Sequence, residues 1–341
     1  MDAAEPVIVR PSLAMKFLRP ILLAASVALI ADARASVTIA WVTVGDAGNA
    51  ADPTTGYGAV AYAYQIGKYE VTNAEYTAFL NAVDPEGANA NFVYNAIMGS
   101  DGRGGITYTA SAASGAKYTI RSSMGDKPVN YVSWYDAARF TNWMHNGQGS
   151  GDTETGAYTL SGNTGIITKN VGATVYLPSE NEWYKAAYYD PTPSAGGGDN
   201  YWLHATQSDT APTIASANVT GGIDNPGANV ANYDSGANWN GLNGNVTTVG
   251  SAAANNYFST ADQAGNVFEW NDAVVGSSRG LRGGSGLGSS ILLAASYRDF
   301  IPPGNEGTNV GFRVASVPVP EPSSFFPAML ICIGVMMRRK R

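Results

Sequence analysis

The sequence has almost no cysteine and very little histidine. Of its 341 residues, Cys332 is the single cysteine, and His145 and His204 are the two histidines. Residues 36–316 therefore cannot form an internal disulfide, and they have no thiolate for metal or redox chemistry. Two histidines this far apart do not by themselves predict a zinc or iron site. We interpret both as surface or hydrogen-bonded structural residues.

Basic charge is also scarce in the body of the chain. Lys and Arg account for 20 residues and Asp and Glu for 27, which gives a formal net charge of −7. The first 35 and last 20 residues hold eight of these bases but only three of the acids, so the segment between them carries a net charge of about −12. A body this acidic is repelled by nucleic acid. Glycine is abundant instead, with 40 residues, which is typical of a loop-rich domain.

The first 35 residues have the pattern of a secretory signal peptide. Lys16 and Arg19 precede an apolar run over residues 21–31 and a small-x-small site that ends at Ala35. This order predicts export and cleavage by signal peptidase after Ala35. The residues before Met15 do not fit the pattern, so Met15 is a second candidate for the start of translation. A buried core helix is the alternative, but it does not explain the order of charge, apolar run and cleavage site.

Residues 317–341 have the pattern of a second targeting signal. A Pro-Glu-Pro motif at 320–322 precedes an apolar run over 325–337, and a basic cluster at 338–341 follows. The run is shorter than the about 20 residues that span a bilayer. This tail resembles the PEP-CTERM sorting signal, which an exosortase cuts near the motif. The resemblance implies transient membrane anchoring through the tail helix and then a place at the cell surface or in the extracellular matrix. A plain membrane anchor is the alternative.

Three stretches carry the capping signal of a short helix. In each, a Ser or Thr is followed three residues later by an acid, and aromatic and aliphatic residues then recur at helical spacing. The hydroxyl accepts from an exposed backbone N–H and the acid reaches back to the cap, which predicts a helix start. A catalytic role for the acids is the alternative, but capping already explains all three. The pairs are Thr72 and Glu75, Ser133 and Asp136, and Ser179 and Glu182.

Short strand-like runs lie between and after these helices, and long loops rich in Gly, Ser, Asn and Ala separate them. The runs cover residues 63–71, 173–178, 267–274 and 310–316, and the loops cover 99–117, 147–172 and 191–256. We find no tandem repeat and no interdomain linker before Val317. The pattern predicts one α+β domain with few short helices, short strands and much irregular chain.

Taken in order, these segments resemble the formylglycine-generating enzyme family, also called sulfatase-modifying factors. The order and approximate spacing of the motifs hold over residues 57–316, after a lead-in strand at 36–56. The resemblance implies a C-type-lectin-like α+β fold with little regular secondary structure. The matching motifs are "YQIGKYEVTNAEYTAFLNA", "PVNYVSWYDAARFTNWM", "YLPSENEWYKAAYY", "GNVFEW", "RGGS", "YRDF" and "NVGFRVA".

The chemistry of that family is copper-dependent oxidation of a substrate cysteine to formylglycine. Its two copper-binding cysteines stand between the "GGS" and "YR" motifs, since soft thiolates hold Cu(I). Here the stretch between the motifs reads "GLGSSILLAAS", and the aligned positions are Gly288 and Leu293. No soft ligand stands there, so we expect neither bound copper nor the oxidase reaction.

The resemblance also implies a first calcium site around "DQAGNVFEW". Its ligands are the side chains of Asp262 and Glu269 and the backbone carbonyls of Gln263, Gly265 and Val267. Calcium takes 6–8 oxygen ligands, which a turn of this kind offers close together. Bound calcium would hold irregular loops that lack disulfides. The alternative is that both acids bond only to water or to backbone N–H groups.

A second implied calcium site lies around "ANYDSGANWNGL". Its ligands are the side chains of Asn232 and Asn240 and the carbonyls of Tyr233 and Leu242. Asn240 stands where the family usually has an aspartate, which weakens this site.

Three arginines, Arg282, Arg298 and Arg313, and Ser285 are interpreted as structural. We expect Arg313 to pair with a buried acid such as Glu269, and Arg298 to form a local ion pair with Asp299. Ser285 has no recognisable base partner, so no Ser-His-Asp triad is predicted.

Two functions from different classes fit these features. The first is a non-catalytic binding or structural module at the cell surface, whose loop aromatics contact carbohydrate or a matrix protein. The second is an oxidoreductase of altered chemistry on the same scaffold, supported by the resemblance alone. The loop aromatics are Tyr201, Trp202, Trp239 and Tyr257.

Overall fold

The computed structural model describes Met1 and residues 36–161, 166–192 and 198–318. The predicted signal peptide and nearly all of the predicted sorting tail, including Cys332, lie outside these residues. Among the residues described, no helix has the length and apolar character needed to cross a bilayer.

The three predicted helices form, and each begins with the capping box that the sequence indicates. At the start of α3 (Trp134–His145), Ser133 Oγ accepts from Asp136 N at 3.2 Å, and the Asp136 carboxylate accepts from Ser133 N at 2.9 Å. The acids of these boxes are therefore capping residues. The helices are α1 (Asn73–Val83), α2 (Ile97–Ser100), α3 (Trp134–His145), α4 (Glu180–Tyr188) and the 3-10 turn η2 (Ser290–Leu293).

The strands are short and form two four-stranded sheets and two small pairs. The first sheet has the order β1-β2-β12-β5, with β1 (Trp41–Val44), β2 (Tyr64–Gly67), β5 (Val175–Tyr176) and β12 (Ala315–Ser316). The second has the order β10-β9-β8-β11, with β8 (Phe268–Val275), β9 (Ser278–Arg282), β10 (Asp299–Ile301) and β11 (Val310–Phe312). The pairs are β3 (Ile106–Tyr108) with β4 (Tyr118–Ile120), and β6 (Thr213–Ile214) with β7 (Val230–Ala231).

The strand-like run 310–316 is one segment in the sequence but two strands in the structure. Its first part pairs in parallel with β8, and its last two residues pair antiparallel with β2 and β5. Between them, the fully buried Arg313 donates to the carbonyls of Gly67 and Lys68, both at 3.1 Å. The chain changes sheets at this arginine, so its guanidinium lies where the two sheets meet.

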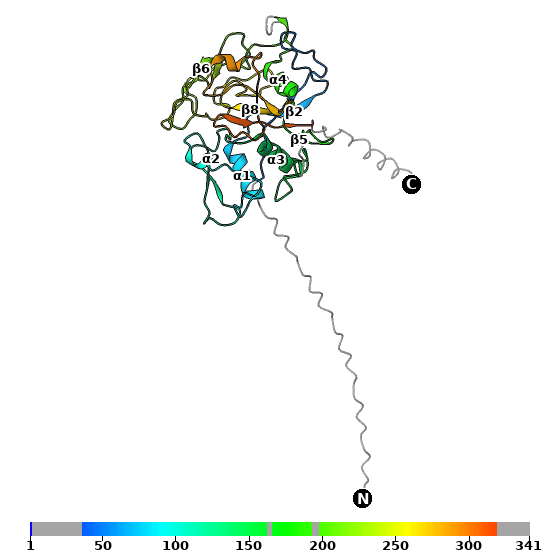
Figure 1. The fold of residues 1–341 in the computed structure, drawn as a ribbon, viewed down its shortest axis with the longest axis vertical. Coiled ribbons are helices and arrows are strands. Elements are labelled where there is room, and N and C mark those ends of the chain that lie inside the picture. The colour runs from blue at the N-terminus through cyan, green and yellow to red at the C-terminus, as the bar shows by residue number, and fades with distance from the viewer. Residues whose placement is uncertain (2–35, 162–165, 193–197, 319–341) are drawn as a thin grey trace, which may run out of the picture. The chain divides into compact units, whose positions relative to one another are not determined.

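An aromatic cluster joins the helices to the sheets. Phe79 of α1 and Phe140 of α3 meet edge to face with ring centroids 5.4 Å apart, and Phe140 meets Phe312 of β11 in the same way at 5.4 Å. Each such ring removes 150–250 Å² from water, which stabilises the fold by several kcal/mol at about 25 cal/mol per Å². Figure 1 shows α1, α2 and α3 on one side of the strands and α4 on the other. The described residues confirm the predicted α+β class with short elements and long loops.

Candidate functional site

The segment that follows β9 is organised by a buried arginine. Arg282 donates from Nε and Nη2 to Glu180 Oε1 at 3.0 and 2.7 Å, and from Nη1 to the carbonyls of Ala295 and Tyr297 at 2.9 and 2.7 Å. Its side chain is fully buried. The arginine therefore connects β9, α4 and the loop after η2.

A second arginine completes this group. Arg298 donates from Nε and Nη2 to the two carboxylate oxygens of Glu180, both at 2.7 Å. The expected local pair between Arg298 and Asp299 is wrong, because Glu180 of α4 presents both oxygens to Arg298. Asp299 instead accepts from the backbone N–H of Phe300. The group holds the segment in place and leaves no free carboxylate for acid–base chemistry.

The positions aligned with the copper cysteines are filled by backbone and core. Gly288 donates its N–H to the carbonyl of Ser285, and a Cβ at this glycine would lie 2.6 Å from a methyl of Leu292. Leu293 is fully buried in a cluster with Trp183 and Tyr188. A cysteine at Gly288 would require the end of the Leu292 side chain to shift, and a cysteine at Leu293 would leave a gap in this cluster.

The serine and the histidines near this segment have other partners. Ser285 is buried, and its hydroxyl accepts from Asn309 Nδ2 at 3.2 Å. His204 forms backbone bridges with Ala294 and Ser208, and burial lowers the pKa of its ring. His145 is hydrogen-bonded to Thr174 through Nδ1. Among the described residues, no group of three or more His, Cys, Asp and Glu is arranged to hold a metal.

The predicted pair of Glu269 and Arg313 is confirmed and lies at the junction of the two sheets. Arg313 Nε and Nη2 donate to the two carboxylate oxygens of Glu269 at 2.5 and 2.6 Å, and both side chains are fully buried. Trp183 Nε1 donates to Glu269 at 2.7 Å, and Arg313 also donates to the carbonyl of Ala261 at 2.9 Å. Both oxygens of Glu269 are therefore engaged.

Two more carboxyl groups, those of Glu70 and Asp262, interact electrostatically with Arg313. Glu70 is only 1% exposed; its Oε1 accepts from Asn266 at 3.2 Å, and Oε2 has no partner among the described residues. Burial and the neighbouring Asp262 raise the pKa of Glu70 well above its usual range. Burial raises the pKa of Asp262 to about 6, although its carboxylate accepts from Gly250 N. These four residues, Glu70, Asp262, Glu269 and Arg313, form a junction cluster in which three carboxyl groups share one guanidinium.

The junction cluster contains both predicted side-chain ligands of the first calcium site, Asp262 and Glu269. Asp262 and Glu70 have the hard oxygen donors that calcium prefers, and a cation bound there would favour the ionised form of both carboxyl groups. Glu269 does not fit as it stands, because Arg313 and Trp183 take both of its oxygens. Gln263, Gly265 and Val267 lie in the same buried turn. Sequence reasoning missed Glu70; its only signal is an acid within the apolar strand-like run 63–71.

The residues of the second predicted calcium site lie in different surroundings. Asn232 is buried and donates to the carbonyl of Asn245 at 2.9 Å, while its Oδ1 has no partner among the described residues. Asn240 is exposed at the tip of a tight turn in which the Leu242 carbonyl accepts from Trp239. The carbonyl of Tyr233 accepts from Gly236 N. The two carbonyls are thus used within local turns.

Most of the loop aromatics expected to contact a ligand are structural. Tyr201 and Trp239 are buried, with Tyr201 donating to the carbonyl of Ala50 and Trp239 to that of Val246. Trp202 donates to Asp190 at 3.1 Å. Only Tyr257 of the four is largely exposed, at 46%. Tyr201 and Trp239 are therefore too buried to belong to such a contact surface, and contact with a ligand stays a prediction for Trp202 and Tyr257.

Comparison with known proteins gives the same assignment as the fold. The model of the sulfatase-modifying factor enzyme 1-like domain matches residues 41–317, so the match includes β1 and β12. No curated protein matches the chain.

Solved structures of similar fold include Treponema denticola variable protein 1, which is 20% identical with a TM-score of 0.46 and covers 84% of this chain and 97% of its own. The match to CarF has 21% identity and a TM-score of 0.47, and it covers 83% of this chain and 99% of CarF. The match to PvdO from Pseudomonas aeruginosa has 17% identity and a TM-score of 0.42, and it covers 82% of this chain and 92% of PvdO. The fold is that of the formylglycine-generating enzymes, and the chain belongs to the family of sulfatase-modifying factor enzyme 1-like domains.

Proposed function

We propose that this protein is an exported, surface- or matrix-associated binding or structural module that does not carry out the oxidase reaction of its family. The observation that carries the proposal is the content of the segment between "GGS" and "YR". Gly288 and Leu293 stand where the copper thiolates are expected, and Leu293 is part of the core. The Arg282–Glu180–Arg298 group keeps the frame of the segment without supplying a soft ligand.

The decisive experiment asks directly for the reaction. The full chain is incubated with copper, oxygen and a cysteine-containing sulfatase-type peptide, beside an active member of the family. We expect the peptide mass to stay unchanged with this protein and to fall with the active member, as thiol-to-aldehyde conversion requires. Conversion by this protein would instead support an oxidoreductase of altered chemistry.

Export and sorting are proposed from the two terminal segments. A chain expressed with an exosortase is expected at the cell surface or in the matrix, and a chain that ends at Val317 is expected in the medium. Cell fractionation with detection of an internal tag distinguishes these outcomes. Equal surface retention of both chains would contradict a sorting role for the tail.

We also propose a structural calcium ion at the junction cluster, with Glu70 and Asp262 as side-chain ligands. Support comes from the unpartnered Glu70 oxygen and from the three carboxyl groups that share the single guanidinium of Arg313 in this cluster. The ion would connect β2 to the loop before β8.

A further inference from the structure

Three asparagines of the chain are followed directly by glycine, and such pairs can lose ammonia from the asparagine side chain. In this reaction the backbone nitrogen of the glycine attacks Cγ of the asparagine. Glycine favours the attack because it has no Cβ to restrict its backbone or shield that nitrogen. The pairs are Asn146-Gly147, Asn240-Gly241 and Asn243-Gly244. Whether each pair reacts depends on how the fold holds the side-chain amide and the attacking nitrogen.

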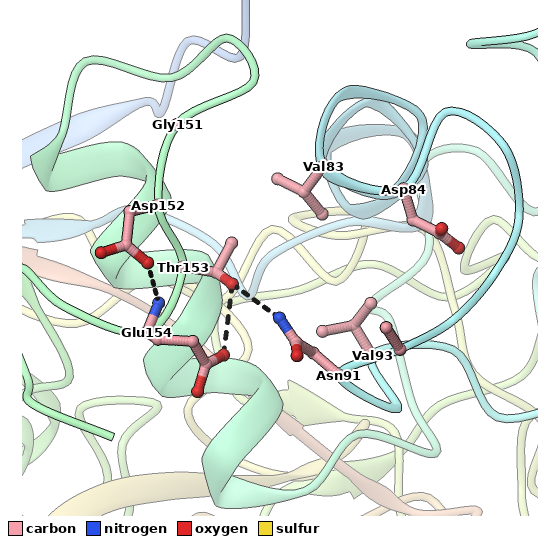
Figure 2. Close-up of a pocket in the computed structure, with 9 residues that line it drawn as sticks. Val83, Asp84, Asn91, Val93, Gly151, Asp152, Thr153 and Glu154 are labelled. Atoms are coloured by element: carbon pink, nitrogen blue, oxygen red, sulfur yellow. Dashed lines mark hydrogen bonds between the residues drawn. The ribbon is translucent and has the colours of Figure 1, made fainter. Parts of the chain in front are cut away.

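The first pair is held on both sides of the reaction. Asn146 Nδ2 donates to the carbonyls of Asp152 and Thr155, both at 2.8 Å, and the Gly147 N–H donates to a carbonyl of α3 at 3.1 Å. The accepting loop is itself fixed, since Asp152 accepts from Glu154 N at 2.7 Å, as Figure 2 shows. The attack at Asn146 would have to break these bonds first.

The third pair is held through its attacking nitrogen. The buried Gly244 donates its N–H to Asn238 Oδ1 at 3.3 Å, and a Cβ at Gly244 would lie only 2.8 Å from the carbonyl oxygen of Gly286. The carbonyl of Asn243 accepts from Arg103 Nη2 at 2.6 Å. The nitrogen therefore cannot turn toward Asn243 Cγ unless the packed backbone around it moves.

The middle pair is free at both reacting groups. Asn240 is exposed, and among the described residues neither its side chain nor the Gly241 N–H has a hydrogen-bond partner. A Cβ at Gly241 would meet nothing within 4 Å. The turn is closed below its tip by Trp239 and Leu242, whose backbone groups pair at 3.1 and 3.2 Å. The tip itself carries no hydrogen bond that the attack must break.

We propose that Asn240 is a self-modification site, at which the chain converts asparagine to aspartate and isoaspartate with water as the only co-reactant. The Gly241 nitrogen loses its proton to solvent and bonds to Asn240 Cγ. The Cγ–Nδ2 bond breaks, and the departing nitrogen takes up a proton and leaves as ammonia. Water then opens the cyclic imide at Cγ, which gives aspartate, or at the backbone carbonyl, which gives isoaspartate.

The conversion changes the charge and the length of this turn. Both products add a negative charge to a loop that Arg103 already contacts through the carbonyl of Asn243. Isoaspartate also routes the backbone through the side chain, which lengthens the turn by a methylene and strains the pairing of Trp239 with Leu242. The inference goes beyond the proposed function, because it holds whether or not the domain binds a ligand.

The test compares the three pairs within one sample of the full chain. The chain is incubated in neutral buffer without ammonium and digested, and mass spectrometry measures the asparagine that remains at each pair. We expect Asn240 to convert at least about tenfold faster than Asn146 or Asn243, which is equivalent to about 1.4 kcal/mol in the barrier. In guanidinium chloride all three should convert at similar rates, since only the fold distinguishes them.

Two matched variants connect the reaction to the change in charge. Asn240→Gln lengthens the side chain by a methylene and disfavours ring closure, so the acidic form separated by ion exchange should be lost. Asn243→Gln is the control, because it makes the same change in the same loop and should leave the acidic form in place. Melting temperatures of both variants check that the fold is intact.

The outcomes decide the proposal in either direction. Selective conversion at Asn240 in the folded chain, faster at higher pH because the Gly241 nitrogen must lose a proton, supports it. A rate at Asn146 or Asn243 equal to that at Asn240 in the folded chain overturns it. Conversion at Asn240 only in guanidinium chloride also overturns it, since the turn would then protect the asparagine.

Discussion

The junction cluster makes a prediction about stability that depends on pH. Replacing Arg313 by Met keeps the volume and removes the one cation among Glu70, Asp262 and Glu269. The substitution also leaves Glu269 with only Trp183 as a donor and removes the arginine donor from the carbonyls of Gly67, Lys68 and Ala261. Leaving buried charge without its partner costs about 3–5 kcal/mol. For a domain of this size we expect a fall in melting temperature of roughly 6–15 °C at pH 7.5.

The loss of stability caused by Arg313→Met should be smaller at low pH. The pKa values of Glu70 and Asp262 are raised in the folded state, to about 6 for Asp262. An acid with a raised folded pKa gives its full stability below its unfolded pKa, near 4, and loses it as pH rises through the folded value. Without Arg313 these pKa values rise further, so the protonated acids tolerate the loss better at pH 5 than at pH 7.5.

Thermal and urea denaturation at both pH values measure the effect. Arg298→Met serves as the control, because Arg298 is partly exposed and lies outside the junction cluster. We expect the control to cost roughly 1 kcal/mol with little pH dependence. An Arg313→Met deficit of the same size at pH 5 and 7.5 would refute the reasoning that uncompensated carboxylates cause it.

Three further predictions concern other parts of the fold. Ser133→Ala removes the cap of α3 and should lower the free energy of unfolding by about 1–2 kcal/mol in urea denaturation; an unchanged value would contradict the capping role. Gly265 has a φ of +88° and a Cβ there would lie 2.1 Å from a backbone oxygen, so Gly265→Ala should cost more than about 3 kcal/mol, while Gly241→Ala, at φ +72° in open space, should cost about 1 kcal/mol. Millimolar calcium should raise the free energy of unfolding of the wild-type chain, and not that of Asp262→Asn, by up to about 2.7 kcal/mol at a hundredfold excess over Kd, with a higher melting temperature as the readout; equal melting curves in calcium and EDTA would rule out the site.

Local features of the fold could be predicted from the sequence. Each capping box joins residues three positions apart, so the pattern contains both partners and the structure confirms all three. The pairing of Glu269 with Arg313 was predictable because both belong to strand-like runs that must be buried. A buried arginine in such a run needs a carboxylate.

Long-range partners could not be predicted in this way. Glu70 and Asn266 are 196 residues apart in sequence, and Glu180 and Arg298 are 118 apart. A sequence pattern does not show which distant acid contacts a given arginine. Proximity in the sequence alone therefore favours Asp299 as the partner of Arg298, although the partner is Glu180. The burial of Tyr201 could not be predicted for the same reason, since its hydroxyl donates to the carbonyl of Ala50, 151 residues away.

Strand β12 lies between β2 and β5, although it is the last strand of the described chain. A chain threaded N-terminus first, through a ribosome or a protein-conducting channel, keeps this place empty until Ser316 has emerged. Until then β2 has one unpaired edge and β5 has no partner in its sheet, and such edges invite pairing with other chains. The first sheet therefore reaches its full strand order only after β12 has emerged, and a chain cut short before Ala315 lacks the strand that joins β2 to β5. Because the last strand occupies an interior position, the first sheet can close only in a chain that extends through β12.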